Sequence, residues 1–127
     1  MRRSEFLVEL SREHHAALSL ANRIARVQDG GAVAGLIKDA QERFARDIEP
    51  HFRREEQGLL LRLGEAGESS LVERTLEEHA RLRELAARLA GGDRTALKAF
   101  GAALSEHVRF EERELFARAE EVLRGPR

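Results

Sequence analysis

The nine-residue pattern H-x-R-x-E-E-x-x-L occurs twice in this chain, once in each half. The first copy runs from His51 to Leu59 and the second from His107 to Leu115. Each copy places a histidine and a glutamate four residues apart, so on a helix both side chains lie on one face, one turn apart. Two such pairs on inward faces are typical of a helical bundle that holds metal ions in its core.

The composition limits both the fold class and the chemistry. With 127 residues, 42% hydrophobic and 35% charged, the chain suits a single globular domain over residues 1–127. A formal net charge of -1, with acids and bases interspersed, argues against nucleic-acid binding and a basic membrane surface. The chain has no cysteine, so metal ligands must be histidines and carboxylates. Without an apolar run typical of a signal peptide or a membrane span, the expected location is cytoplasmic.

Glycines divide the chain into four segments that lack the alternation of strands. The breaks lie at Gly30–Gly31, between Gly64 and Gly67, and at Gly91–Gly92. We expect helices over about 4–28, 32–63 and 70–89, and a fourth from Asp93 to Gly125-Pro126. The short connections favour an all-α fold, an up-down-up-down antiparallel four-helix bundle with the metal site in its core.

Three local signals bear on the ends and the course of these helices. Ser70-Leu-Val-Glu73 reads as a capping box that starts the third helix, and Asp93 reads as the N-cap of the fourth. Pro50 lies inside the second segment, where a proline removes a backbone hydrogen bond. Two interpretations stay open: a break between two shorter helices, or a kink in one helix that aims His51.

The five histidines are distributed over all four expected helices. His79, for example, follows Leu76 by three residues and precedes Leu82 by three, on the apolar face of its helix. Polar residues surround His15 at the matching offsets, so it is expected to turn away from the core. The other four are expected to point inward, one from each helix: His14, His51, His79 and His107.

Two glutamates complete the predicted site. Glu55 and Glu111 follow the histidines of the two repeats, and two buried carboxylates close together would repel one another. A pair of divalent cations removes that cost, so we predict the metal ligands His14, His51, Glu55, His79, His107 and Glu111. Glu56 and Glu112 lie about 100° further round the helix. We expect them to be surface charges or to pair with arginines, and to be ligands only where the helix is locally distorted.

The order of these residues resembles the hemerythrin-like (HHE cation-binding) domain over essentially the whole chain. The resemblance implies a four-helix bundle around a non-haem di-iron centre, bridged by an oxo or hydroxo group. It assigns Glu55 and Glu111 as carboxylates that bridge the two iron ions, and the four inward histidines as the remaining protein ligands. The first-helix ligand maps to His14, with His15 as the alternative.

The chain departs from the oxygen-carrying hemerythrins at one position. Those proteins have a second histidine four residues after the third-helix ligand, where this chain has Arg83. A guanidinium cannot ligate a metal, so we expect Arg83 to turn aside or to pair with Glu84 or Glu56. Two six-coordinate ions need about twelve positions, and the ligands above with a bridging oxygen fill about ten. The extra open position argues against simple oxygen carriage.

The sequence therefore predicts a protein that binds, senses or detoxifies a small molecule such as O2, NO or peroxide. It favours a binding or sensor protein over a dedicated enzyme, and it leaves open a weak redox activity on peroxide or NO. Two alternatives stay open: a metal-dependent regulatory or interaction module for iron homeostasis, and zinc or manganese in place of iron. A ferritin-like oxidase fits poorly, because its Glu-x-x-His order is absent from these positions. Phe44, Phe100 and Phe110 either line the site or simply pack in the core.

Overall fold

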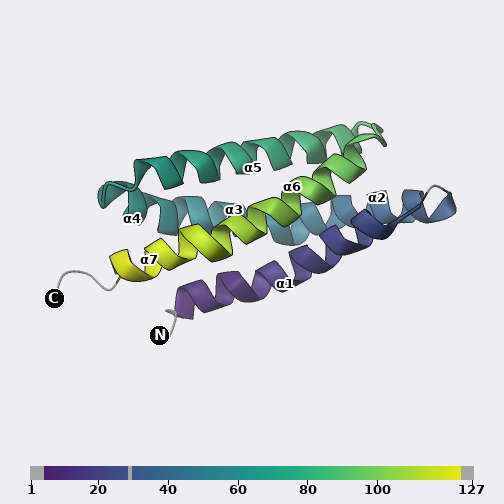
Figure 1. The fold of residues 1–127 in the computed structure, drawn as a ribbon. Coiled ribbons are helices and arrows are strands. Elements are labelled where there is room, and N and C mark those ends of the chain that lie inside the picture. The colour runs from purple at the N-terminus through teal and green to yellow at the C-terminus, as the bar shows by residue number, and fades with distance from the viewer. Residues whose placement is uncertain (1–4, 29, 124–127) are drawn as a thin grey trace.

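The computed structural model describes residues 5–28 and 30–123, which form helices and short turns without a strand. These residues make four helical segments, as predicted, and the segments lie lengthwise beside one another in an arrangement consistent with a four-helix bundle (Figure 1). The first is α1 (Glu5–Arg26), and the third is α5 (Ser69–Ala90). The second comprises α2 (Gly31–Arg43), η1 (Phe44–Ile48), α3 (Glu49–Arg54), η2 (Glu55–Leu59) and α4 (Leu60–Glu65). The fourth comprises α6 (Ala96–Phe110), η3 (Glu111–Leu115) and α7 (Phe116–Leu123).

The second segment continues through Pro50 instead of breaking into separate helices. The π turn η1 ends two residues before Pro50, and the N–H of Glu49 bonds to the carbonyl of Phe44 across this wider turn. Two further π turns, η2 and η3, begin at Glu55 and Glu111, at the same place in both copies of the repeat. π turns within α-helices are frequent at functional sites. The local distortion considered for the repeats is therefore present in both.

Both predicted helix starts are shifted. In α5 the carbonyl of Glu68 accepts the N–H of Val72, so Ser70 lies inside the first turn and the predicted capping box is wrong. The fourth helix begins at Ala96, and its N-cap is Thr95, not Asp93. The Asp93 carboxylate instead accepts the N–H of Thr95 and holds the turn that leads into the helix. The predicted ends at Ser4 and Gly125-Pro126 lie outside the described residues.

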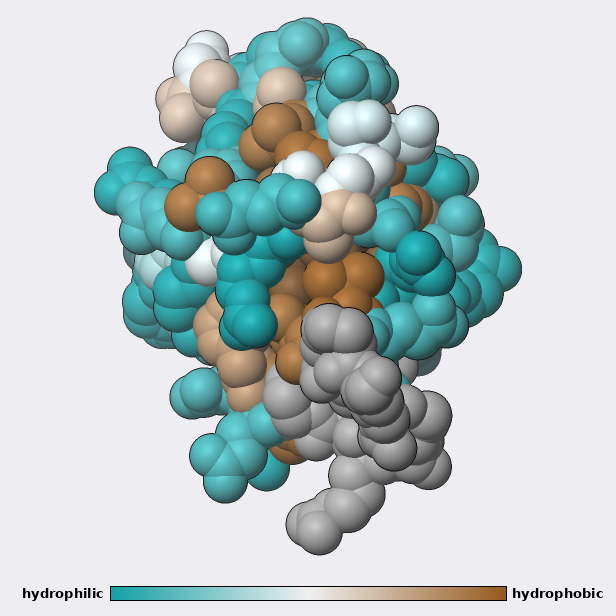
Figure 2. Space-filling view, turned by 90° about the vertical axis from the view of Figure 1, so that its left-hand side faces the viewer, coloured by the Kyte–Doolittle hydropathy of each residue, from teal (hydrophilic) through white to brown (hydrophobic). Residues whose placement is uncertain are grey.

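Two hydrophobic clusters lie along the bundle, one on each side of its centre. The larger joins the second half of α1 to α2, α5 and α6, and the smaller joins the first half of α1 to α4 and α7. On α1, His14 lies between Leu10 of the smaller cluster and Leu20 of the larger. Seen from the end at which α1 starts, polar side chains surround the hydrophobic ones (Figure 2). No helix within the described ranges 5–28 and 30–123 combines the length and apolar character that a membrane crossing requires.

Leu76 departs from the predicted apolar face of α5. Its side chain is 43% exposed, whereas the neighbouring Thr75 is buried. The Thr75 hydroxyl donates to the carbonyl of Leu71 at 2.7 Å, so it can face inward without an unpaired polar group. The prediction that Leu76 packs in the core is wrong, while His79 and Leu82 are buried as expected.

Gly101 allows α6 to approach α1 closely. A Cβ atom at this position would lie 2.6 Å from Cγ2 and 2.9 Å from Cβ of the buried Ile24. We expect Gly101→Ala to lower the free energy of unfolding by about 1–3 kcal/mol, because the overpacked helices must separate. Denaturant unfolding measures the change. Gly35→Ala in α2 is the control, because its Cβ would meet no neighbouring side chain among the described residues, and it should stabilise. Equal effects of the two substitutions would refute the packing argument.

Candidate metal centre

Six buried side chains meet between the two hydrophobic clusters, and each helical segment contributes at least one. None is more than 5% exposed. They are the six predicted ligands: His14 from α1, His51 from α3, Glu55 from η2, His79 from α5, His107 from α6 and Glu111 from η3. The structure thus brings together every residue of the predicted set.

The donor atoms form two overlapping groups of four. His14 and His51 belong to one group and His79 and His107 to the other, and Glu55 and Glu111 belong to both. Within each group the donor atoms lie within 4.8 Å of one another. The pattern of shared carboxylates and separate histidines suits two ions side by side.

Each carboxylate reaches one histidine of each group. Glu111 lies 2.8 Å from Nε2 of His14 and 3.0 Å from Nε2 of His107. Glu55 lies 3.2 Å from Nε2 of His51 and 3.0 Å from Nε2 of His79. Glu55 and Glu111 therefore each lie between the two histidine pairs and belong to both groups.

Four of these donor atoms face one another without an aligned hydrogen bond. Among the described residues, Nε2 of His51 lies 3.2 Å from an oxygen of Glu55 and Nε2 of His107 lies 3.0 Å from one of Glu111, yet all four buried atoms lack a hydrogen bond. A buried polar atom that makes no hydrogen bond lowers the stability of the folded protein. Metal ions would supply the missing partners, because imidazole nitrogens and carboxylate oxygens are ligands of iron, zinc and manganese. The residues present therefore fit a pair of metal ions.

Without metal, the carboxylates are balanced by protonated histidines. Burial lowers the pKa of His51, but contacts with Glu111 and Glu55 outweigh it and raise that pKa to about 11. Burial likewise lowers the pKa of His107, but the charge of Glu111 outweighs this effect and raises that pKa to about 10. The same balance raises the pKa values of His14 and His79. Burial alone would raise the pKa of Glu111, but the surrounding histidines, first His107, hold it well below its ordinary value.

Metal binding is expected to release protons, because a histidine ligates only in its neutral form. The raised pKa values stabilise the metal-free fold fully below pH 6.5, and this contribution is lost as the pH rises through about 10 to 11. Metal affinity should increase as the pH rises, since fewer protons compete. Calorimetric titration with Zn²⁺ in two buffers of different ionisation enthalpy measures the number of protons released. The same titration repeated at several pH values measures the affinity, and an affinity that does not change with pH would contradict the prediction.

Each of the four histidines donates its Nδ1–H to a second carboxylate from another helical segment. These bonds are 2.6 to 2.7 Å long and join His14 to Glu112, His51 to Glu13, His79 to Glu56 and His107 to Glu78. When a histidine binds metal through one ring nitrogen, a carboxylate hydrogen-bonded to the other nitrogen fixes its tautomer and the direction of its ring. Here it leaves all four Nε2 atoms facing the centre.

The outer carboxylates form a ring around the bundle. The first segment gives a glutamate to the histidine of the second, the second to the third, the third to the fourth and the fourth to the first. Glu56 and Glu112 therefore lie outside the two ligand groups, although the helix is distorted at both. Sequence reasoning missed Glu13 and Glu78. The available signal was their position directly before His14 and His79.

The remaining histidine and the phenylalanines considered from the sequence lie away from the cluster or pack elsewhere in the core. His15 is exposed, as expected. Phe44 and Phe100 pack edge to face within the larger cluster, so they serve as ordinary core. The phenylalanine rings stacked on histidines are ones that the spacing did not indicate: Phe52 on His79 at 3.9 Å and Phe116 on His14 at 5.2 Å.

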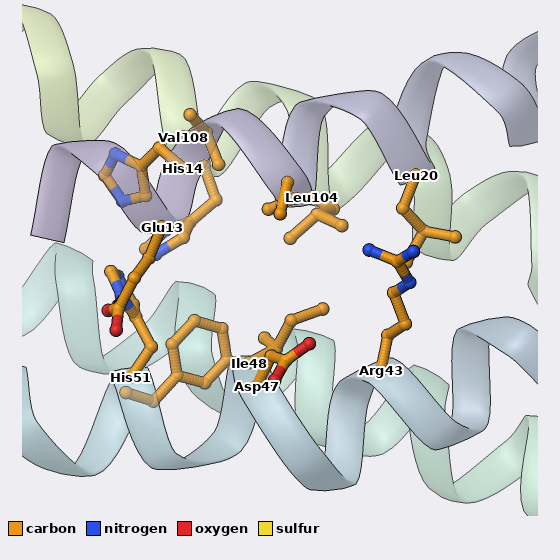
Figure 3. A pocket seen from close by; sticks show the side chains of 13 residues that line it. Glu13, His14, Leu20, Arg43, Asp47, Ile48, His51, Leu104 and Val108 are labelled. Atoms are coloured by element: carbon orange, nitrogen blue, oxygen red, sulfur yellow. Dashed lines mark hydrogen bonds and ion pairs between the residues drawn. The ribbon is translucent and has the colours of Figure 1, made fainter.

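A cavity of about 30 Å³ reaches the histidines between α1 and the second segment. Glu13, His14 and His51 lie at one end and Arg43 at the other, with Ile48 and Leu104 between them (Figure 3). The lining combines apolar side chains with charged ones and histidines, and the volume is enough for a water-sized molecule. A molecule of this size could lie against the His14–His51 pair.

The comparisons with known proteins agree with this geometry. The family model described as the hemerythrin HHE cation binding domain matches residues 6–119. The chain belongs to this family. The match includes all six predicted ligands, so the HHE-domain protein is a cation-binding protein whose buried histidine–glutamate cluster could hold the metal. Searches of curated proteins and of solved structures gave no match.

Proposed function

We propose that this HHE-domain protein holds a non-haem di-iron centre, oxo- or hydroxo-bridged, in the core of an up-down-up-down antiparallel bundle. We further propose that the centre binds, senses or detoxifies a small molecule such as O2, NO or peroxide. The observation that carries the proposal is the pair of overlapping ligand groups with shared Glu55 and Glu111. When bound, iron would supply the capacity to take up such a molecule and to exchange electrons with it.

The chain's own residues have distinct roles in this proposal. Glu55 and Glu111 would be shared between the two ions, and the four histidines would complete two sites of four protein ligands each. The outer glutamates, such as Glu13 behind His51, orient the rings. Phe52 and Phe116 are fully buried and cover one face each of the His79 and His14 rings.

The open positions favour ligand binding over pure metal storage. Four protein ligands to each ion leave about two of six positions on each ion for a bridging oxygen and an exogenous molecule. The cavity beside His14 and His51 provides the space for such a molecule on one side of the centre. Its small volume suits a small ligand better than a large one.

Spectroscopy tests the proposed ligand chemistry. Protein loaded anaerobically with Fe(II) is exposed separately to O2, NO and peroxide, followed by azide. We expect new near-ultraviolet and visible bands with at least one of them, and bands of the oxidised protein that shift with azide. His15→Ala is the matched control, because this exposed histidine lies outside the cluster and its loss should change nothing. Iron-loaded protein that responds to none of these reagents would overturn the proposed ligand chemistry, whatever its metal content.

Zinc and manganese remain candidates for the same ligands, since both accept imidazole and carboxylate. A metal-dependent regulatory module is the second candidate function. The buried atoms without hydrogen bonds favour it, because bound metal would satisfy them and so stabilise the core further. Competition of iron, zinc and manganese for the metal-free protein shows which metal the site prefers. The melting temperature of each loaded form shows whether the fold depends on that metal.

A further inference from the structure

Arg83 lies one helical turn after His79 on α5 and contacts the metal centre indirectly. Its guanidinium makes bonds of 2.9 and 3.2 Å to the two oxygens of Glu56, and a third of 2.6 Å to Glu49. The predicted pairing with Glu56 is confirmed, and Glu84 pairs with Arg81 instead. A bidentate pair of this kind fixes a carboxylate in direction as well as position.

The Glu56 carboxylate transmits this constraint to His79. Its Oε2 accepts hydrogen bonds from both Arg83 and Nδ1 of His79, the latter at 2.7 Å. On the other side of the ring, Nε2 lies 3.0 Å from Glu55. A continuous chain of contacts therefore leads from the half-buried guanidinium of Arg83 to the shared carboxylates.

Phe52 provides a second link between the same two residues. Its ring stacks on His79 with centroids 3.9 Å apart and planes 13° apart. The Arg83 guanidinium carbon lies over the Phe52 ring, 5.6 Å from its centroid. The His79 side chain is 0% exposed, so these contacts leave its ring little room to turn.

Two other histidines also have an arginine behind their outer carboxylate, but those arginines make fewer described hydrogen bonds to it. Arg54 bonds to Glu13 behind His51, and Arg74 bonds to Glu78 behind His107. Among the described contacts, each of these arginines makes one hydrogen bond to its glutamate, whereas Arg83 holds both oxygens of Glu56. Arg54 and Arg74 side chains are 42% and 50% exposed, compared with 34% for Arg83.

We propose that Arg83 is a positioning residue for the ligand His79, acting through both oxygens of Glu56 to fix the tautomer and the direction of the ring. The proposal rests on the proposed metal centre, because it gives His79 a ligand's role. Arg83 also draws the negative charge of Glu56 away from the imidazole, which makes His79 a weaker electron donor. The ion beside His79 and His107 then has a higher reduction potential than it would without Arg83.

The test compares Arg83→Gln with two controls. Glu49→Gln removes the other partner of Arg83 but leaves the path through Glu56 intact, and Arg81→Gln removes an exposed arginine two positions away. We expect Arg83→Gln to weaken binding of one metal ion by about tenfold in a chelator competition, and to lower its reduction potential. The ring nitrogens of His79 should show the largest nuclear magnetic resonance shifts, and Arg83→Lys should restore part of each effect. Both controls should change these readouts much less.

A double variant decides whether Arg83 acts through Glu56. If it does, Arg83→Gln adds nothing in a Glu56→Gln background; additive effects would overturn the proposal. Unchanged affinity, potential and His79 signals in a folded Arg83→Gln would also overturn it. If that variant does not fold, Arg83→Met, which also removes the guanidinium, supplies the same comparison. If wild-type protein binds no metal pair, the proposed function fails, and the His79 ring signals of the metal-free protein still show whether Arg83 fixes the ring.

Discussion

Glu111→Ala is expected to abolish tight binding of both metal ions. Glu111 is 0% exposed, belongs to both ligand groups, and reaches His14 in one and His107 in the other. Its loss removes a ligand from each ion and the negative charge that balances the pair. Glu55→Ala should act in the same way, because Glu55 is equally buried and equally shared. Metal analysis after desalting, with iron and with zinc, measures the effect.

Two further variants separate ligand loss from disturbance of the core. Glu111→Gln keeps the shape of the side chain and removes its charge, so it should lose the metal pair without a large cavity. Glu106→Ala removes an exposed glutamate from the same helix and should leave the metal content unchanged. Retention of two tightly held ions in both Glu55→Ala and Glu111→Ala would contradict the bridging assignment.

Metal is expected to raise the thermal stability of the protein strongly. The centre buries two carboxylates and four imidazoles, and four of its donor atoms, among the described residues, lack a hydrogen-bond partner. An ion that binds only the folded state stabilises it by about 4 kcal/mol when its free concentration is a thousand times its Kd. For a domain of this size we expect a rise in Tm of about 10 °C or more.

Scanning calorimetry of metal-free and metal-loaded protein measures this rise. Glu111→Gln is the control, since its Tm should not respond to metal at the same concentration. A wild-type Tm that stays the same after complete removal of metal would show that the core is stable without it. That result would also exclude the regulatory module whose folding depends on metal.

The six side chains that cluster in the core could be predicted from the sequence because the information is local to each helix. A histidine and a glutamate four residues apart share a face, and the apolar neighbours of His79 indicate that this face is buried. Four helices follow from the glycine breaks for the same reason. None of these inferences needs the relative position of two helices.

The pairing of each outer carboxylate with its histidine could not be predicted in this way, because the two residues lie on different helices. Glu13 and His51 are 38 residues apart, and their contact depends on how α1 and α3 align along the bundle. Phe52 was missed for a related reason: it follows His51 directly but stacks on His79 of α5. The π turns also escape helical periodicity, since they change the phase of the helix inside the repeat.

The number of iron ions per chain tests the central claim most directly. The metal-free protein is loaded anaerobically with excess Fe(II), freed of unbound metal, and assayed for iron and protein together. Two buried ligand groups with shared Glu55 and Glu111 predict about two iron ions per chain. A value of about one, or protein that retains no iron, would contradict the di-iron centre.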